Sequence, residues 1–255
     1  MTDPRGHSLK GTIELHVGEH TIRLQATLPP GKVALGAVLP LARQITEAVV
    51  DSAVADTKSA GKTVSCRAGC GGCCRQPVPI GRAEARRLFE LVDAMPEPRR
   101  SIVKARFGEA LAQIRKTDLL QRHANLPAAN ANDRPRRVTE WTMDYFRLKV
   151  PCPFLEDESC SIHPERPLVC REYLVTSPAS ECATLSLNGI QRVPINASVS
   201  KAVTEIEQDG GIRDWIPLVM ALEWTASHPA ETDRRRALDW VRRLQQILGR
   251  NEETS

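Results

Sequence analysis

Eight cysteines offer the most distinctive chemistry in this 255-residue chain. Four of them stand within nine residues of a glycine-rich stretch, where there is no amphipathic face to bury. Thiolates are ligands for zinc, iron and iron–sulfur clusters, so we interpret the cysteines as metal ligands rather than as inert core residues or a disulfide framework. They form two groups separated by 77 residues without a thiol: Cys66, Cys70, Cys73 and Cys74, and then Cys152, Cys160, Cys170 and Cys182.

The first group has the composition of a metal knuckle. Gly69, Gly71 and Gly72 allow backbone conformations that curl a chain around a small ion. Adjacent side chains point in different directions, so Cys73 and Cys74 can hardly serve one ion equally. A disulfide between such neighbours would be strained. Three options stay open: two metals, one polynuclear cluster, or one ligand with a supporting neighbour.

The second group cannot be a knuckle of its own, because seven, nine and eleven residues separate its successive cysteines. Five prolines between Pro151 and Cys182 predict neither a regular helix nor a strand there. We therefore expect the fold to gather these thiols. Nearby guanidinium groups could donate hydrogen bonds to the sulfur atoms and offset their negative charge; the candidates are Arg67, Arg75, Arg166 and Arg171.

Histidines add little to this set. His163 stands at a ligand-like spacing after Cys160, but neighbouring thiolates already supply donors, so we do not count it as a ligand. The remaining histidines have no partner pattern and are expected at the surface or in a hairpin: His7, His16, His20, His123 and His228.

The residues between the cysteines also form a pattern. The second group contains Cys-Pro-Phe-Leu from Cys152, Ser-Cys-Ser-Ile-His around Cys160, and Arg-Pro-Leu-Val-Cys-Arg ending at Arg171. Together with Cys-x3-Cys-x2-Cys-Cys from Cys66, this resembles the YkgJ-type cysteine-cluster family, which is described as zinc- or iron-chelating. The resemblance covers about 66–182 and implies seven of these cysteines as ligands, with Cys182 as a candidate eighth. It also implies that Arg166 and Pro167 shape the turn before Cys170.

Helical periodicity dominates the rest of the chain. Residues 12–28 alternate as a β-hairpin around Gly18-Glu19, with a type II′ turn that places Val17 opposite His20. Helices are predicted at 35–59, around 85–92 and 103–114, at 138–147, and in two tail segments around 215–222 and 238–248; a loop is predicted at 125–135. The predicted fold class is mainly α, with a small N-terminal hairpin and an irregular cysteine-rich metal-binding core. Its segments are 1–60 (hairpin plus helix), 61–190 (cysteine-cluster domain) and 191–255 (helices completing the same domain).

Composition and apolar runs limit the expected cellular location and the expected kinds of partner. Apolar runs are too short to cross a bilayer, and no secretory signal is visible, so we expect a cytoplasmic protein with free thiols. A net charge of +4 and 4% aromatic residues argue against nucleic acid. Between residues 81 and 137, 13 Lys and Arg outnumber 7 Asp and Glu. We interpret this surplus as solvated helix faces, with an acidic protein partner as the alternative.

Two functions compete at this stage. The first is a metal-binding protein whose two cysteine groups meet around zinc, iron or an iron–sulfur cluster. The second is an iron–sulfur enzyme, because Cys66-x3-Cys70-x2-Cys73 has the spacing used by radical S-adenosylmethionine enzymes, and a similar cluster occurs in flagellin lysine methylases. Such radical enzymes continue with alternating strands and helices, whereas this chain continues with helical pairs. We therefore expect a binding protein and assign no catalytic residue.

Overall fold

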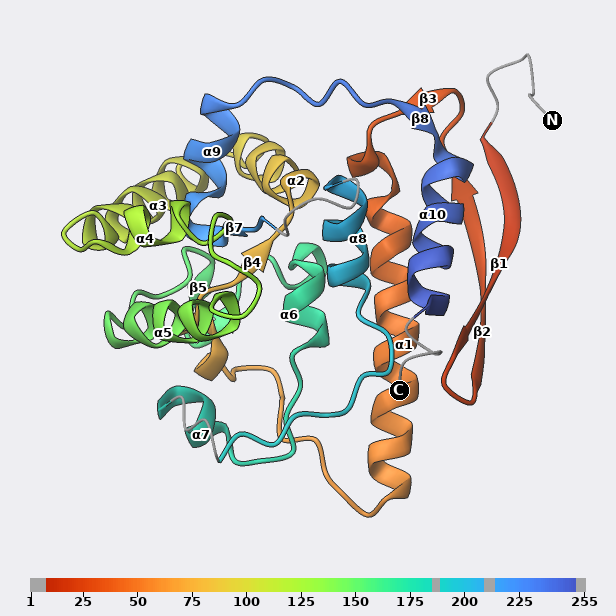
Figure 1. Cartoon of the computed structure of the whole chain (residues 1–255), viewed down its shortest axis with the longest axis horizontal. Helices are drawn as coiled ribbons and strands as arrows, with labels where there is room; N and C mark the ends of the chain where they lie inside the picture. Colours follow the sequence, from red (N-terminus) through yellow and green to blue (C-terminus); the bar gives the residue numbers. More distant parts are fainter. Residues whose placement is uncertain (1–7, 185–188, 209–213, 251–255) are drawn as a thin grey trace.

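The computed structural model describes residues 8–184, 189–208 and 214–250. It confirms the predicted class, because helices build most of the molecule and a two-stranded hairpin stands at its N-terminal side (Figure 1). The hairpin and helices α1 and α10 lie together on one side of the molecule. A second group of helices, α2, α3, α5 and α9, lies on the other side, with α6 between them (Figure 1).

The hairpin follows its alternating pattern. Strand β1 (Leu9–Val17) pairs with β2 (His20–Leu28), and Val17 lies opposite His20 as predicted. Gly18 has a φ of +56° while Glu19 stays outside the left-handed region, which are the φ signs of a type II′ turn. The apolar face of the hairpin, including Ile13 and Leu15, is buried against α1 and α10.

The first long helix begins later than predicted. Residues Leu35–Val38 form a 3₁₀ turn, η1, and α1 spans Leu39–Ser59 with Pro40 in its first turn, where no amide donor is needed. Its end has the bonds of a Schellman motif: Gly61 (φ +74°) donates to the Lys58 carbonyl and Lys62 donates to the Thr57 carbonyl. Gly61 thus turns the chain toward the first cysteine group.

The middle of the chain forms the predicted helical pair and further short elements. The pair is α2 (Arg82–Asp93) and α3 (Arg99–Ile114), followed by α4 (Leu119–Ala124) and α5 (Arg134–Arg147). Helix α4 was not predicted. The predicted start of α5 lies four residues too late, because Pro135 falls in the predicted loop. Proline fits the first turn of a helix, so α5 includes it.

The second cysteine group is less irregular than predicted. It contains the short strands β5 (Leu155–Glu156) and β6 (Ser159–Cys160), the turn η3 (His163–Glu165), and the helices α6 (Leu168–Glu172) and α7 (Ala179–Thr184). The expectation of no regular helix is therefore wrong for Cys170 and Cys182. Pro167 precedes α6 at its N-cap and Pro178 directly precedes α7, so the prolines bound these helices rather than interrupt them.

The tail differs from its prediction at its beginning. Helix α8 (Val199–Glu207), which Ser198 caps, was not predicted. The helix expected around 215–222 is instead strand β7 (Ile216–Pro217), turn η4 (Leu218–Met220) and α9 (Ala221–Ser227), because β7 pairs with β4 (Pro79–Ile80). Strand β8 (Arg235–Arg236) pairs with β3 (Lys32–Val33) and leads into α10 (Ala237–Arg250).

Three buried clusters hold these elements together. The largest joins the hairpin, α1, α8 and α10, and reaches Leu168 at the start of α6. A second surrounds α2, α3 and Phe154, and the half-buried Cys152 and Cys160 pack against it. The third contains Trp141, Tyr145 and neighbouring residues of α3, α4 and α5. The second cysteine group therefore has apolar support on two sides.

Candidate metal centre

The first cysteine group lies in the segment between α1 and β4. Ser65 anchors its start, since its backbone N–H donates to the Val175 carbonyl at 2.9 Å and its hydroxyl to the Thr176 carbonyl at 3.1 Å. Gly69 has a φ of +77°, and a 3₁₀ turn, η2 (Gly72–Arg75), carries Cys73 and Cys74. The glycines thus form the tight turns that the sequence predicted.

The structure brings this segment against the second group. The backbone N–H of Cys152 donates to the carbonyl oxygen of Cys74 at 2.7 Å. On the other side, the Gln76 amide donates to the Cys182 carbonyl at 3.3 Å. A Cβ added at Gly72 would lie 3.2 Å from the Ala179 carbonyl oxygen and 3.4 Å from the Cys182 Cβ, so η2 and α7 pack closely only because residue 72 is glycine.

A short hairpin positions Cys160. Strands β5 and β6 pair so that Cys160 lies opposite Leu155. The two turn residues, Asp157 and Glu158, have φ values of 47° and 56°, as a type I′ turn requires. The pair of Arg75 with Glu158, 2.5 Å between Nη2 and Oε1, ties this turn to η2. Cys160 is therefore held next to the first group.

Electrostatic coupling among the thiols is centred on Cys73. Burial raises the pKa of Cys152 to about 12, and Cys160 and Cys73 add to the shift. Burial also raises the pKa of Cys170 well above its usual range, and Cys152 and Cys73 add to it. Cys73 contributes in the same way, after burial, to the raised pKa values of Cys66, Cys160 and Cys182. Cys73 therefore lies close to thiols of both groups.

Cys74 behaves differently from its neighbour. A hydrogen bond with the Cys74 thiol is the main cause that raises the pKa of Cys73, followed by burial. Cys74 is among the leading causes of the shifted pKa values of Cys73 and Arg75. The two adjacent thiols therefore lie close together, while Cys73 also acts on thiols of both groups.

All eight thiols are free, Cys182 is buried and the other seven are half-buried. Across residues 8–184, 189–208 and 214–250, no three His, Cys, Asp or Glu side chains are already grouped closely enough to hold a metal ion. The hydrogen bonds described above bring together the segments that carry the thiols. Which of the thiols bind the metal stays a prediction. The donor set itself fits zinc or iron, because both metals bind thiolate sulfur.

The histidines are not part of this gathering. The His163 ring is exposed, and its pKa is lowered by Arg166 and then by burial, without a contribution from any thiol. His123 corrects the expectation of a surface residue, because it is half-buried against Trp141 and Trp215 and burial lowers its pKa. His7 lies outside the described residues.

Two carboxyl groups with unusual surroundings were not predicted: Glu84, which contacts the start of α6, and Glu207, which contacts the start of α2. Glu84 accepts a hydrogen bond from the Leu168 amide at 2.8 Å, at the start of the helix that carries Cys170. Glu207 accepts from the amides of Arg82 and Ala83 at 2.7 and 2.6 Å, at the start of α2. Burial raises the pKa of both carboxyls to about 7. No sequence pattern distinguishes these glutamates from exposed ones.

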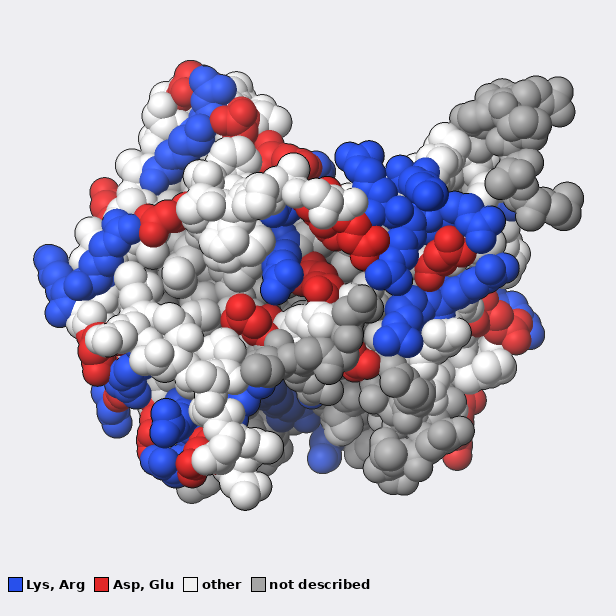
Figure 2. Space-filling model, turned by 45° about the horizontal axis from the view of Figure 1, so that its top comes forward, with Lys and Arg blue, Asp and Glu red and all other residues white. Residues whose placement is uncertain are grey.

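The basic surplus of 81–137 is largely paired. Arg99 and Arg106 contact Glu156, Arg122 contacts Asp144, and Lys104 contacts Asp93. On the face seen in Figure 2, basic side chains lie beside acidic ones over much of the surface. This arrangement agrees with solvated helix faces.

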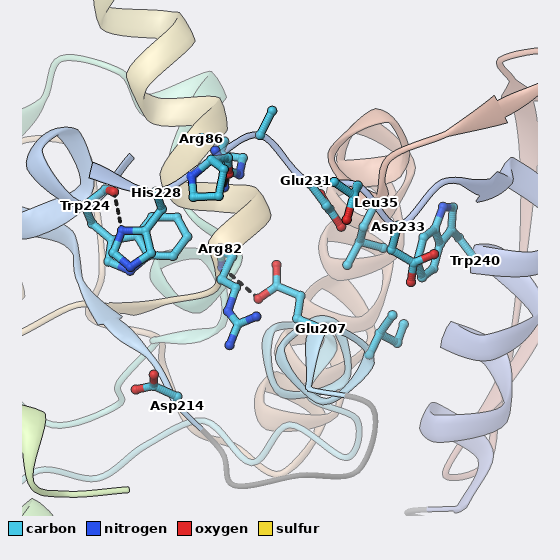
Figure 3. A pocket seen from close by; sticks show the side chains of 14 residues that line it. Leu35, Arg82, Arg86, Glu207, Asp214, Trp224, His228, Glu231, Asp233 and Trp240 are labelled. Carbon is cyan, nitrogen blue, oxygen red and sulfur yellow. Dashed lines mark hydrogen bonds between the residues drawn. The ribbon is translucent and has the colours of Figure 1, made fainter. Parts of the chain in front are cut away.

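A pocket of about 430 Å³ lies away from the cysteines, between α2, α8, α9 and the segment before β8. Arg82 and Arg86 project from α2 toward it, and Glu231 and Asp233 come from the opposite side (Figure 3). Trp224 stacks on His228 with ring centroids 4.3 Å apart. None of the described residues that line it is a cysteine.

Within the described residues, no helix combines the length and apolarity needed to span a bilayer. Comparison with curated proteins and with solved structures finds no match. Residues 65–185 match the model of the CxxCxxCC family, whose description is "Putative zinc- or iron-chelating domain". The resemblance expected for about 66–182 is thereby confirmed over nearly the same segment, since the model of this family matches residues 65–185.

Proposed function

We propose that this chain is a metal-binding protein in which thiols from both cysteine groups hold zinc or iron between η2, the β5–β6 hairpin, α6 and α7. The observation that carries the proposal is the position of Cys73. Its thiol adds to the raised pKa values of five other cysteines, which come from both groups: Cys66, Cys152, Cys160, Cys170 and Cys182. The hydrogen bond from Cys152 to Cys74 supports it independently of charge.

The proposed role of the metal is to fasten the fold. The ligands come from segments about 80 residues apart, so a shared metal would remove much of the freedom of the unfolded chain. Binding free energy for a structural zinc site is about 10 kcal/mol or more at neutral pH, and it adds directly to folding stability. The cysteines would supply the thiolates, and the metal would supply the cross-link.

An iron–sulfur enzyme is the weaker alternative. Strand pairs in the described part of the chain are antiparallel, whereas a radical-enzyme barrel needs parallel strands alternating with helices. An iron–sulfur cluster without catalysis stays within the proposal, because an all-sulfur donor set suits it as well as zinc.

Whole-protein metal analysis combined with an ultraviolet–visible spectrum tests the proposal. Stoichiometric zinc with a featureless visible spectrum would identify a zinc protein. Iron with acid-labile sulfide and visible charge-transfer absorption would identify a cluster. Protein that binds neither metal, even after anaerobic reconstitution, would overturn the proposal.

Serine variants test whether the two groups share a site. Cys70→Ser and Cys160→Ser are each expected to lower metal content and melting temperature, and the double variant should cost little more than the worse single one. Ser159→Ala, an exposed neighbour of Cys160, is the matched control. If both single cysteine variants keep full metal and melting temperature, the groups do not converge on one site.

A further inference from the structure

The four arginines near the cysteines do not have equivalent surroundings. Arg75 is paired with Glu158, and Arg171 is paired with Glu47 and also donates to backbone carbonyls. Arg67 is exposed. Arg166 differs from these three, because its Nε is buried and has no hydrogen-bond partner among the described residues.

The backbone of Arg166 is fixed between two cysteines of the second group. Its N–H donates to the His163 carbonyl at 3.4 Å, and its carbonyl accepts from Arg171 Nε at 3.1 Å. Pro167 and α6, which carries Cys170, follow immediately. The backbone at Arg166 is therefore fixed at the turn before α6.

The charge of Arg166 reaches thiols of both groups. Burial raises the pKa of Cys66 and of Cys160, and Arg166 opposes both shifts. At Cys73 the hydrogen bond with Cys74 and burial raise the pKa, and Arg166 again opposes them. Among these three thiols, Arg171 is a leading cause at Cys160 only, where its effect is smaller than that of Arg166. Arg166 is thus a cation that lies close to thiols of both groups.

A buried N–H donor without an acceptor is unfavourable, and a guanidinium donor more so. The hydroxyl of Ser161, next to Cys160, is also buried without a partner. Metal-bound thiolates are strong acceptors that carry excess negative charge, and donors around a metal centre commonly hydrogen-bond to its ligands. Two unpartnered donors beside converging thiols are what such a centre would use.

We propose that Arg166 donates a hydrogen bond from Nε to a metal-bound sulfur of Cys66, Cys73 or Cys160, and that its charge offsets that of the thiolates. This inference rests on the proposed function. It makes Arg166 a positioning residue of the centre, whereas Arg67, Arg75 and Arg171 serve other contacts or solvent.

The test compares Arg166→Gln and Arg166→Lys with the control Arg67→Gln, an exposed arginine that also adjoins a cysteine. Zinc affinity is measured by competition with a chromophoric chelator. We expect Arg166→Gln to bind zinc 10- to 100-fold more weakly, Arg166→Lys to recover part of the loss through its charge, and Arg67→Gln to stay within about twofold of wild type.

A second readout separates the hydrogen bond from a general loss of structure. In Co²⁺-substituted protein, the sulfur-to-metal charge-transfer absorption depends on hydrogen bonds to the sulfur atoms. It is expected to shift to lower energy in Arg166→Gln and to keep its wild-type position in Arg67→Gln. Far-ultraviolet circular dichroism of both variants verifies the fold.

The outcomes are distinct. If wild-type protein binds neither zinc nor Co²⁺, the proposed function falls and this inference falls with it. If wild-type protein binds zinc and a folded Arg166→Gln variant has the same affinity and the same Co²⁺ spectrum, only this inference is overturned. If Arg166→Gln does not fold, Arg166→Lys decides: unchanged affinity and spectrum in that variant overturn the directional hydrogen bond.

Discussion

The backbone N–H of Cys152 donates a hydrogen bond to the carbonyl oxygen of Cys74 at 2.7 Å, joining two residues separated by 77 others. The bond fixes the backbones of the two cysteine groups against each other without using a thiol. The thiols of Cys74 and Cys152 take no part in this bond and remain available for metal binding. This relationship underlies the predictions on metal binding.

Cys73 and Cys74 form a matched pair for testing which thiols bind metal. The Cys73 thiol is among the leading causes that raise the pKa values of thiols in both groups, whereas the Cys74 thiol is, among the cysteines, a leading cause only at Cys73. Cys73→Ser is therefore expected to abolish or strongly weaken metal binding, and Cys74→Ser to retain most of it. Metal content and chelator competition measure the difference. Equal losses in the two variants would favour a cluster or two metals that use both sulfurs.

Metal removal is expected to loosen the segments that carry the cysteines before it affects the hairpin. The hairpin packs on α1 and α10 in the largest apolar cluster. In the sequence it lies well before the first cysteine. Hydrogen exchange measured before and after treatment with a chelator should show the largest gain at 65–76 and 152–182. A uniform gain over the whole chain would argue against a local fastening role.

Gly72 tests the close contact between η2 and α7. Gly72→Ala would place Cβ 3.2 Å from the Ala179 carbonyl oxygen, so α7 must shift. We expect a loss of about 1–3 kcal/mol in the free energy of unfolding, together with weaker metal binding. Gly108→Ala is the control, because nothing lies within 4 Å of its added Cβ and it stands inside α3, where alanine should stabilise by up to about 1 kcal/mol. Denaturant unfolding compares the two variants with wild type, and an unchanged midpoint in Gly72→Ala would contradict the contact.

Local patterns explain which elements can be predicted. The helices α1, α2, α3 and α10 carry apolar residues at helical spacing over three or more turns, and the hairpin alternates around a glycine turn. The residues around Trp215 have similar spacing but extend into β7, since pairing with β4 is a tertiary effect. Short α4 and α8 lack the length that makes periodicity readable.

The candidate site, too, could be predicted only in part from the sequence. Cysteine spacing indicates thiolate chemistry, because only residue types and separations are needed. It cannot indicate that Gly72 meets α7, or which of four arginines has an unpartnered Nε, since these depend on contacts between segments 80 or more residues apart. The buried Glu84 and Glu207 are invisible for the same reason.

Glu207 links the stability of the fold to pH. Burial raises its pKa to about 7 from an unfolded value near 4.5, so its protonated form is favoured by folding. This stabilisation is complete below about pH 4.5 and is lost as pH rises through 7, and the shift corresponds to roughly 3 kcal/mol. Glu207→Gln removes the titrating group, so its free energy of unfolding should stay level between pH 5 and 8 while that of wild type falls by up to about that amount. Glu109→Gln, at an exposed position on α3, should parallel wild type throughout. Urea unfolding at several pH values gives the comparison, and a Glu207→Gln curve parallel to wild type would show that the carboxyl is not titrating in this range.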